Sequence, residues 1–500
     1  MISAFANTWR VPELRDRIIF TLIMVIIVRL GVNISLPGVN PAAISEWMDW
    51  SRKSRGASAG DQLGAILNVF SGGGLQQAAI FSLGIMPYIS ASIMMQLLSA
   101  VVPQFAKMKR EEGGQQKINQ YTRILTLVIA GVQGFLLAKS LKNPASNPIM
   151  QGFENVEAVL VPNHGTPFVL MATLVIVAAT MFLMWIGDQI TERGIGNGIS
   201  VIISVNIIAA LPGGLTQAWD TYVVPATEGS PFKAMTLVFL IAFLLFITAA
   251  IIAITQAQRR IAVQYAKRAT NRASKQMTGH TQYLPLKVNY AGVMPIIFAG
   301  AVINLPFFIL RMANPEWGWV GTVQEILLPT KPAYYILAGL LIFFFSYFWV
   351  ATMFQPSEIA ENLKKSGGYI PGVRPGKPTA DFLDYTMTRL TFAGAIFLTI
   401  IFVLPNILAQ IFNLPALVAN FFGGTSLLIL VGVLLDIMRQ VETHLLQRNY
   451  DGFLRKGKLK GRIERRQASG QSASGGIIFW LLVFAAIMLV LAATGFIFNR

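Results

Sequence analysis

The chain alternates between long apolar stretches and shorter polar segments. About eleven stretches are long enough to cross a bilayer, since a helix of about 20 residues spans roughly 30 Å of hydrocarbon. Some carry no charged side chain at all, for example residues 234–258 and 332–357. The pattern predicts an all-α polytopic membrane protein, with spans near residues 18–36, 78–100, 124–141, 168–186, 195–211, 235–256, 291–310, 333–354, 389–408, 420–436 and 477–498.

Two segments need a closer look. Residues 390–435 are long enough for two spans, with the turn between Pro405 and Pro415. Residues 62–71 form a mildly apolar stretch that is too short to span, and three glycines that permit a sharp reversal follow at 72–74. This short helix is either a re-entrant element or a helix on the outer surface, and the pattern alone favours neither.

Composition agrees with a membrane protein. Hydrophobic residues make up 54% of the chain and charged residues 13%, and the mean hydropathy is +0.57. These values lie outside the range of soluble domains. The first span lacks a small-residue cleavage site, so we expect it to remain as an anchor rather than to be removed as a signal peptide.

Most of the 40 Lys and Arg residues fall in alternate loops. Basic loops resist translocation, so their face is cytoplasmic and the N-terminus lies there too. An odd number of spans then places the C-terminus, with Asn499 and Arg500, outside. The net charge of +17 has two possible origins, an ordinary topology bias or an anionic partner such as nucleic acid.

The chain lacks the residues that most enzymes and metal sites use. It has no Cys and only three His, at positions 164, 280 and 444, all in or beside predicted loops. Thiolate chemistry is therefore excluded. We expect no catalytic residue, no metal and no cofactor.

Seven motifs in register resemble the SecY family, whose members are the central subunits of protein-conducting channels. They include FSGGGL at 70–75, GDQITERGIGNGIS at 187–200 and QRRIAVQYAKR at 258–268. The first of them continues at 80–93, and the other four lie at 284–289, 361–368, 371–376 and 422–428. The resemblance covers residues 10 to about 462.

The resemblance implies a ten-helix clamshell of two inverted five-helix halves with a re-entrant plug helix. Inverted halves bring a constriction to the bilayer midplane. The apolar run after residue 476 goes beyond the family pattern and predicts an extra transmembrane helix. The expected parts are an N-terminal half at 1–211 with a plug at about 62–74, a C-terminal half at 212–462 with cytoplasmic loops 256–290 and 356–388, a linker at 463–476 and the extra helix at 477–498.

The resemblance also assigns a pore. Its hydrophobic ring maps onto Ile85, Ile89, Ile203, Ile297 and Ile429. An apolar ring excludes ions by dewetting and offers no polar group to hold a passing chain. The plug beneath it maps onto Gln62, Leu63, Ile66, Leu67, Phe70, Gly72 and Gly73.

Polar residues and a proline add detail to the predicted pore. Spans 2 and 3 facing spans 7 and 8 would form a lateral gate to lipid. Ser90 and Asn304 are its candidate polar residues, although each could instead bond to a neighbouring helix. Pro87 is expected to kink span 2 near the ring, because proline removes a helix hydrogen bond.

Two cytoplasmic loops match the docking surfaces of the family. Loop 256–290 has seven basic residues and no acidic one, and Ala262, Val263 and Tyr265 favour a structured hairpin. Phosphates of ribosomal RNA suit such a loop, because contact with a phosphate backbone needs only cations. The second loop holds an Arg on a stiff Pro/Gly turn at 371–376, the Arg that the family uses with the SecA motor and the ribosome. The docking residues are Arg259, Arg260, Lys267, Arg268, Arg272 and Arg374.

The remaining charged residues near the spans are assigned to structure. Arg29 lies near the outer end of span 1, where it could extend to the interface. The stretch with Asp188, Glu192 and Arg193 is an inside turn with helix-capping chemistry. We expect structural roles for all four residues.

The resemblance implies that the chain translocates unfolded secretory proteins across the cytoplasmic membrane and releases transmembrane segments laterally. Expected partners are SecE, SecG, SecA, the ribosome, preproteins with their signal sequences, and lipids. A secondary transporter of small solutes is the alternative, but it needs polar groups at midplane, which these spans lack apart from Arg29. An intramembrane enzyme would need a nucleophile with a base, or a metal cluster.

Overall fold

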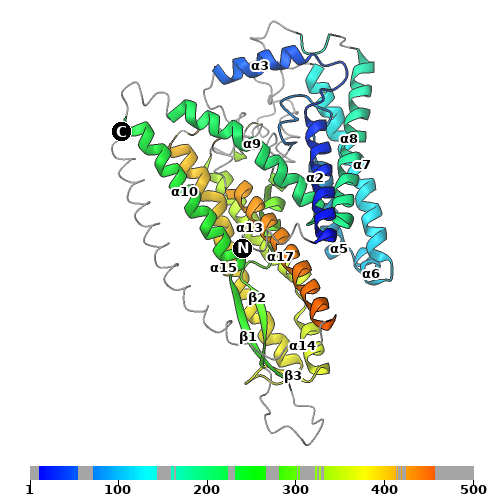
Figure 1. Cartoon of the computed structure of the whole chain (residues 1–500), viewed down its shortest axis with the longest axis vertical. Helices are drawn as coiled ribbons and strands as arrows, with labels where there is room; N and C mark the ends of the chain where they lie inside the picture. Colours follow the sequence, from blue (N-terminus) through cyan, green and yellow to red (C-terminus); the bar gives the residue numbers. More distant parts are fainter. Residues whose placement is uncertain are drawn as a thin grey trace, which may run out of the picture. The chain divides into compact units, whose positions relative to one another are not determined.

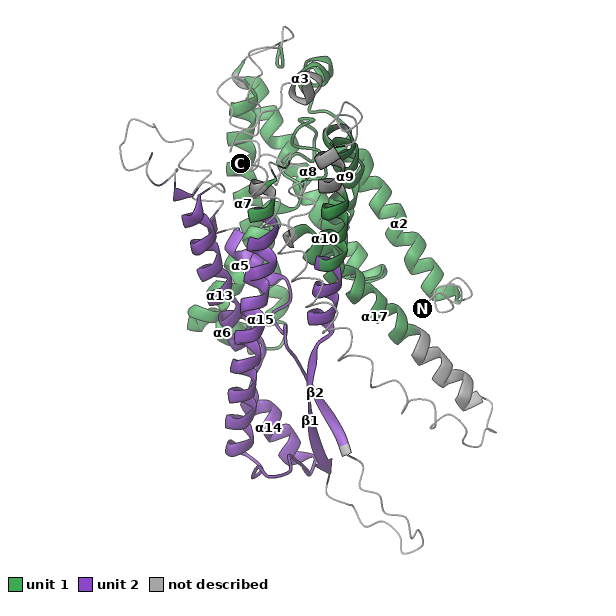
Figure 2. Ribbon diagram, turned by 90° about the vertical axis from the view of Figure 1, so that its left-hand side faces the viewer, with its two compact units in different colours: residues 1–246, 407–500 green, residues 247–406 purple. Residues whose placement is uncertain are grey.

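The computed structural model describes residues 11–53, 71–142, 159–162, 165–222, 231–265, 281–300, 302–303, 321, 323, 326–327, 331–412, 414, 418 and 424–455. These form two compact units (Figure 2). Unit 1 comprises residues 1–246 and 407–500, and unit 2 comprises residues 247–406. The unit boundaries fall inside two helices, α10 (Pro231–Gln256) and α15 (Lys377–Ile411).

Helices dominate the described part of unit 1 (Figure 1). They are α2 (Pro12–Val32), α3 (Pro41–Lys53), α5 (Met86–Val101), α6 (Pro103–Arg110), α7 (Gly114–Lys142), α8 (Thr166–Arg193), α9 (Gly198–Tyr222), the larger part of α10 and α17 (Gly424–Arg455). Helix α7 packs on both α5 and α8, and α9 packs on α8 and α17.

Unit 2 combines long helices with a small sheet. Its helices are α13 (Pro332–Met353), α14 (Pro356–Lys365) and the larger part of α15. Its strands are β1 (Gln258–Tyr265), β2 (Thr281–Lys287) and β3 (Gly368–Tyr369), in the antiparallel order β2-β1-β3.

Six of the predicted spans are confirmed as helices long and apolar enough to cross a membrane, within the residues described. They are α7, α8, α9, α10, α13 and α15. The pair α5 and α6 would make a seventh, broken by a bend of 101°. Pro103 causes the bend, because it cannot donate to the preceding turn and forces Val102 into an extended conformation.

Two other helices, α2 and α17, cover most of the spans predicted at 18–36 and 420–436. The span predicted at 291–310 is described only at 291–300 and 302–303. The eleventh span, at 477–498, lies outside the described residues together with the linker before it. The ten-helix layout, the inverted halves and the extra helix therefore stay predictions.

Three details differ from the sequence predictions. Helix α3 falls in a segment where no element was predicted, and it buries Ala43, Ile44 and Trp47. Helix α15 continues past Pro405 to Ile411, so the turn expected to start at Pro405 begins later. One proline in the middle of a long apolar helix costs one hydrogen bond but does not end it when the flanking turns pack.

The predicted kink at Pro87 is wrong. Helix α5 starts at Met86, so Pro87 lies in its first turn, where the missing N–H is not needed. Residues 78–85 are not helical, because Ala78 and Gly84 adopt positive φ angles of 43° and 55°. Proline therefore begins this helix instead of bending it.

Candidate docking surface and channel elements

Loop 256–290 forms the predicted hairpin. Strands β1 and β2 pair from Gln258↔Lys287 to Gln264↔Thr281. Alternate residues of β1 face the interior, so Ile261 and Val263 are buried beside Leu286 of β2. Two of the residues that predicted the hairpin therefore also stabilise it, since Val263 is buried in its core and Tyr265 packs against that core.

The two described docking arginines of the hairpin are both exposed. Arg259 pairs with Leu286 and Arg260 with Pro285, and strand geometry sends their side chains to opposite sides of the sheet. Lys267, Arg268 and Arg272 lie outside the described residues.

The second docking loop joins the first in one sheet. Strand β3 pairs with β1 through Gln264↔Tyr369 and Tyr265↔Gly368. The Tyr369 hydroxyl donates to Gln264 Oε1 at 2.9 Å. We call β1, β2, β3, α14 and the turn at 371–376 the sheet platform. Sequence reasoning placed the two loops separately, because a two-residue strand leaves no readable pattern.

The tip that carries Arg374 is held by its backbone. Gly372 and Gly376 take positive φ angles of 84° and 101°. The Val373 N–H donates to the Ile370 carbonyl at 3.0 Å, and the buried Thr379 hydroxyl donates to the Arg374 carbonyl at 2.8 Å. The side chain of Arg374 is exposed. Thr379 thus helps to fix the backbone of the tip, and the stiffness expected from the prolines stays a prediction.

The sheet platform rests on the ends of two long helices. Val350 and Phe354, at the end of α13, and Leu383 and Met387, near the start of α15, share one core with the buried residues of β1 and β2. Leu383 is fully buried, with 0% exposed. The platform is therefore packed directly on α13 and α15.

The five residues of the predicted pore ring lie on four segments. In unit 1, Ile85 directly precedes α5, and Ile89, Ile203 and Ile429 lie on α5, α9 and α17. Ile85, Ile203 and Ile429 are at most 4% exposed, and Ile89 is half-buried. In unit 2, Ile297 is half-buried within residues 291–300. The ring stays a prediction.

The plug residues Gln62, Leu63, Ile66, Leu67 and Phe70 lie outside the described residues, as does Asn304 of the predicted gate. Gly72 and Gly73 are described, with positive φ angles of 69° and 97° that favour glycine. Ser90 is half-buried on α5. The gate assignment therefore stays a prediction for both of its residues.

The 194–198 turn after α8 is a polar junction that sequence reasoning resolved only as an inside turn. The Ile195 N–H donates to Thr21 Oγ1 of α2 at 3.1 Å, and the Gly196 N–H donates to Gln440 Oε1 of α17 at 2.8 Å. The Gly198 N–H donates to Thr191 Oγ1 at 2.8 Å. Four helices are thus connected through one turn.

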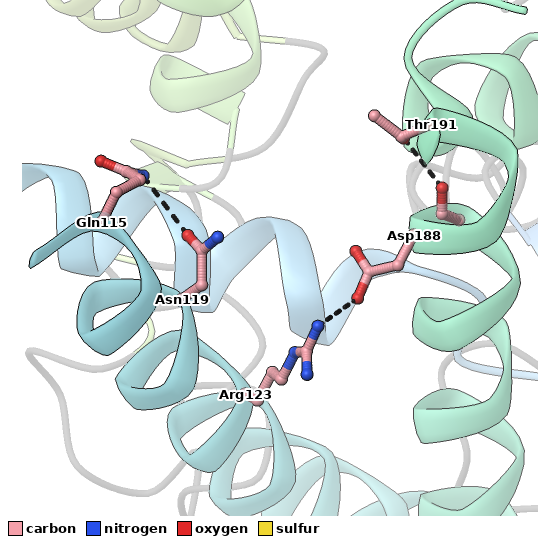
Figure 3. A network of polar contacts seen from close by, with 6 residues as sticks. Gln115, Asn119, Arg123, Asp188 and Thr191 are labelled. Atoms are coloured by element: carbon pink, nitrogen blue, oxygen red, sulfur yellow. Dashed lines mark hydrogen bonds and ion pairs between the residues drawn. The ribbon is translucent and has the colours of Figure 1, made fainter. Parts of the chain in front are cut away.

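An ion pair lies between α7 and α8, on the N-terminal side of this junction (Figure 3). Arg123 of α7 and Asp188 of α8 are 2.7 Å apart, and neither is fully buried. In the same view Gln115 donates to Asn119 along α7, and Thr191 bonds back to the Gly187 carbonyl. These contacts support the structural role predicted for Asp188. Among the described residues, no group of three or more His, Cys, Asp or Glu gathers to hold a metal.

Comparison with known proteins gives concordant results. The family model described as SecY matches residues 79–438. The protein translocase subunit SecY of Thermotoga maritima is 40% identical over 463 residues, which is 92% of this chain and 100% of the relative.

Two solved structures share the fold. One is titled "The structure of a protein conducting channel", with a TM-score of 0.58 and 15% identity. The other, titled "Sec61 in the Canine ribosome-channel complex from the endoplasmic reticulum", has a TM-score of 0.57 and 15% identity. Each alignment covers 86% of this chain and 92% of the other. With a family match over most of its length and a relative at 40% identity, the chain belongs to the SecY family of protein translocase subunits.

Proposed function

We propose that the chain is a protein-conducting channel, which passes unfolded secretory proteins across the cytoplasmic membrane and releases apolar segments sideways into lipid. Family membership supports the passage of proteins across the membrane, since relatives aligned over their full length are translocase subunits. Six described helices of spanning length and composition agree with a multi-pass membrane protein. As a translocase subunit it is not an enzyme, so a partner must supply the energy.

The sheet platform is the proposed site of docking. Its exposed Arg259, Arg260 and Arg374 suit an anionic surface, and phosphate contact supplies affinity without base specificity. The exposed rings of Tyr283 and Tyr369 add surfaces on which a base or an apolar side chain can stack. The ribosome complex named for canine Sec61 supports a ribosome as one occupant.

The motor SecA is the second proposed occupant, through Arg374 on its fixed tip. SecE and SecG are the proposed companion subunits. The long apolar faces of the spanning helices offer them surface, for example α2 with Ile26 and Leu30, which are 58% and 61% exposed.

The proposed transport function has a direct test in reconstitution. Liposomes with the chain, SecE, SecG and SecA should protect an unfolded preprotein from added protease when ATP is present. The same liposomes should show no ATP-independent uptake of small solutes. Solute uptake without preprotein protection would contradict the channel and favour the secondary transporter.

The proposed topology has the N-terminus in the cytoplasm and the C-terminus outside. Residues 477–498 are charge-free and follow a basic tail, which should remain inside. The parent has no Cys, so Asn499→Cys creates a single labelling site. An impermeant maleimide should label it in intact cells. Labelling only after lysis would place this end inside and remove the eleventh span.

A further inference from the structure

Within the described residues of the first predicted span, 18–36, the charged side chain is Arg29. Arg29 occupies the last turn of α2, between the exposed apolar residues Ile26 and Leu30. A cation in an apolar stretch is costly unless it finds a bonding partner, and such residues mark functional positions. Arg29 has a partner, because its Nη1 donates to the carbonyl oxygen of Gly72 at 3.0 Å.

Gly72 is the point at which the predicted plug segment joins the described structure. A Cβ atom on Gly72 would lie 2.7 Å from Arg29 Nη1 and 2.5 Å from Asn206 Oδ1. Asn206 is 2% exposed and lies on α9, three residues after Ile203 of the predicted ring. The backbone of Gly72 is therefore enclosed by polar groups from two helices, with no room for a side chain.

The chain after this point is fixed to the end of α2. The Ile80 N–H donates to the Ile34 carbonyl and the Leu36 N–H donates to the Ala78 carbonyl, both at 2.9 Å. Ser35 and Ala79 form an antiparallel bridge. Residues 71–85, which we call the hinge segment, thus have an anchored downstream part. The space around Gly73 is open by contrast, since the nearest atom to a Cβ there is Gln77 Nε2 at 4.0 Å.

From this geometry we propose that Arg29 is a positioning residue that latches the plug hinge in the closed channel. The bond joins a charged donor on α2 to the carbonyl of the buried Gly72, so any movement of Gly72 away from α2 must break it. Asn206 lies one helical turn beyond Ile203 on α9. A movement of α9 that displaces Ile203 therefore also displaces the Asn206 side chain beside Gly72. Release of the hinge is therefore linked to widening of the ring.

This inference rests on the proposed plug, and the experiment separates the two. Resting ion conductance is measured in planar bilayers for the parent, for a deletion of residues 62–70 and for Arg29→Met and Arg29→Lys. The deletion tests the plug and Arg29→Met removes the latch donor. The Lys variant keeps a charged donor, so its conductance should stay near that of the parent. We expect Arg29→Met to raise the conductance about tenfold, the factor for loss of one charged hydrogen bond.

A second readout follows the plug itself. Leu67→Cys provides the single thiol of the protein, and its rate of modification by maleimide reports exposure of the plug. Arg29→Met should speed this reaction by a similar factor. A purely structural role for Arg29 would lower the yield of folded protein without changing plug exposure in the protein that folds.

If Arg29→Met fails to fold, two glycine variants test whether the contact between Arg29 and Gly72 keeps the channel closed. Gly72→Ala and Gly73→Ala both place a side chain at a positive φ, but only the first collides with Arg29 and Asn206. Gly72→Ala should therefore leak much more than Gly73→Ala. Equal leaks from the two, or parental conductance and labelling in Arg29→Met while the plug deletion leaks, would overturn the latch. A plug deletion that does not leak would instead refute the plug and the latch with it.

Discussion

The arginines proposed to act on the sheet platform differ from Arg29, which bonds to the hinge segment. On the platform, Arg259, Arg260 and Arg374 are exposed on a scaffold whose core is already complete. At the hinge, Arg29 is half-buried and bonded to one backbone carbonyl. The attraction of several exposed charges to an anionic partner adds up and is screened by salt. A single, partly buried hydrogen bond depends on the relative position of its two groups and is screened little. Substitutions on the platform should therefore change binding, and substitutions at the hinge should change closure.

The largest effect should come from charge reversal on the hairpin. Changing Arg259, Arg260, Lys267 and Arg268 to Glu should abolish ribosome binding, because each loses a phosphate contact and adds repulsion. Cosedimentation with ribosomes over a salt series measures this. For the described pair alone, Arg259→Glu with Arg260→Glu should reduce the slope of log K against log salt by about two.

The matched control for that pair reverses Lys107 and Lys109, which are exposed on α6 and carry the same charge change. Binding near the parental level is expected for this control. If the control and the hairpin pair lose binding equally, net charge and not the platform governs the interaction.

Reversal of the tip charge should stop motor-driven export. Arg374→Glu leaves the hydrogen bonds of the tip in place, because none of them uses the Arg374 side chain. The protein should therefore insert and fold normally while SecA-dependent translocation falls to background. Normal translocation by this variant would remove Arg374 from the docking site.

Substitutions in the pore ring should have the same kind of effect as substitutions at the hinge, namely a higher resting ion conductance. Replacing Ile85, Ile89, Ile203 or Ile297 by Gly removes an apolar wall and should raise resting conductance severalfold without affecting ribosome binding. Bilayer recordings and cosedimentation on the same preparations separate the two readouts. Parental conductance in every ring variant would contradict the pore assignment.

The smallest effect is expected from loosening the platform tip. Thr379→Ala deletes the hydroxyl that binds the Arg374 carbonyl, a bond worth about 1 kcal/mol. SecA affinity should fall a few-fold at most, with the charge retained. Thr379→Ser keeps the hydroxyl and serves as the control. A loss as large as that of Arg374→Glu would mean that tip geometry outweighs its charge.

The sequence predicted the features that follow from length and alternation. Six spans could be read because an apolar run of spanning length seldom forms anything but a transmembrane helix, and the hairpin could be read from Ala262, Val263 and Tyr265. The joining of the two docking loops could not be read, because β3 contributes only Gly368 and Tyr369. The partner of Arg29 was also hidden, since a bond to a backbone carbonyl 43 residues away leaves no sequence signature.

Crosslinking of a translocating chain to the ring tests the channel most directly. Ile203 and Ile208 lie on the same helix, α9, with 4% and 45% of the side chain exposed. A photoreactive residue is placed at either position while a secretory chain is arrested during transport. We expect adducts with the arrested chain from position 203 and very few from position 208, which faces away from the core. Adducts from 208 at equal or higher yield would show that the polypeptide does not pass through the ring.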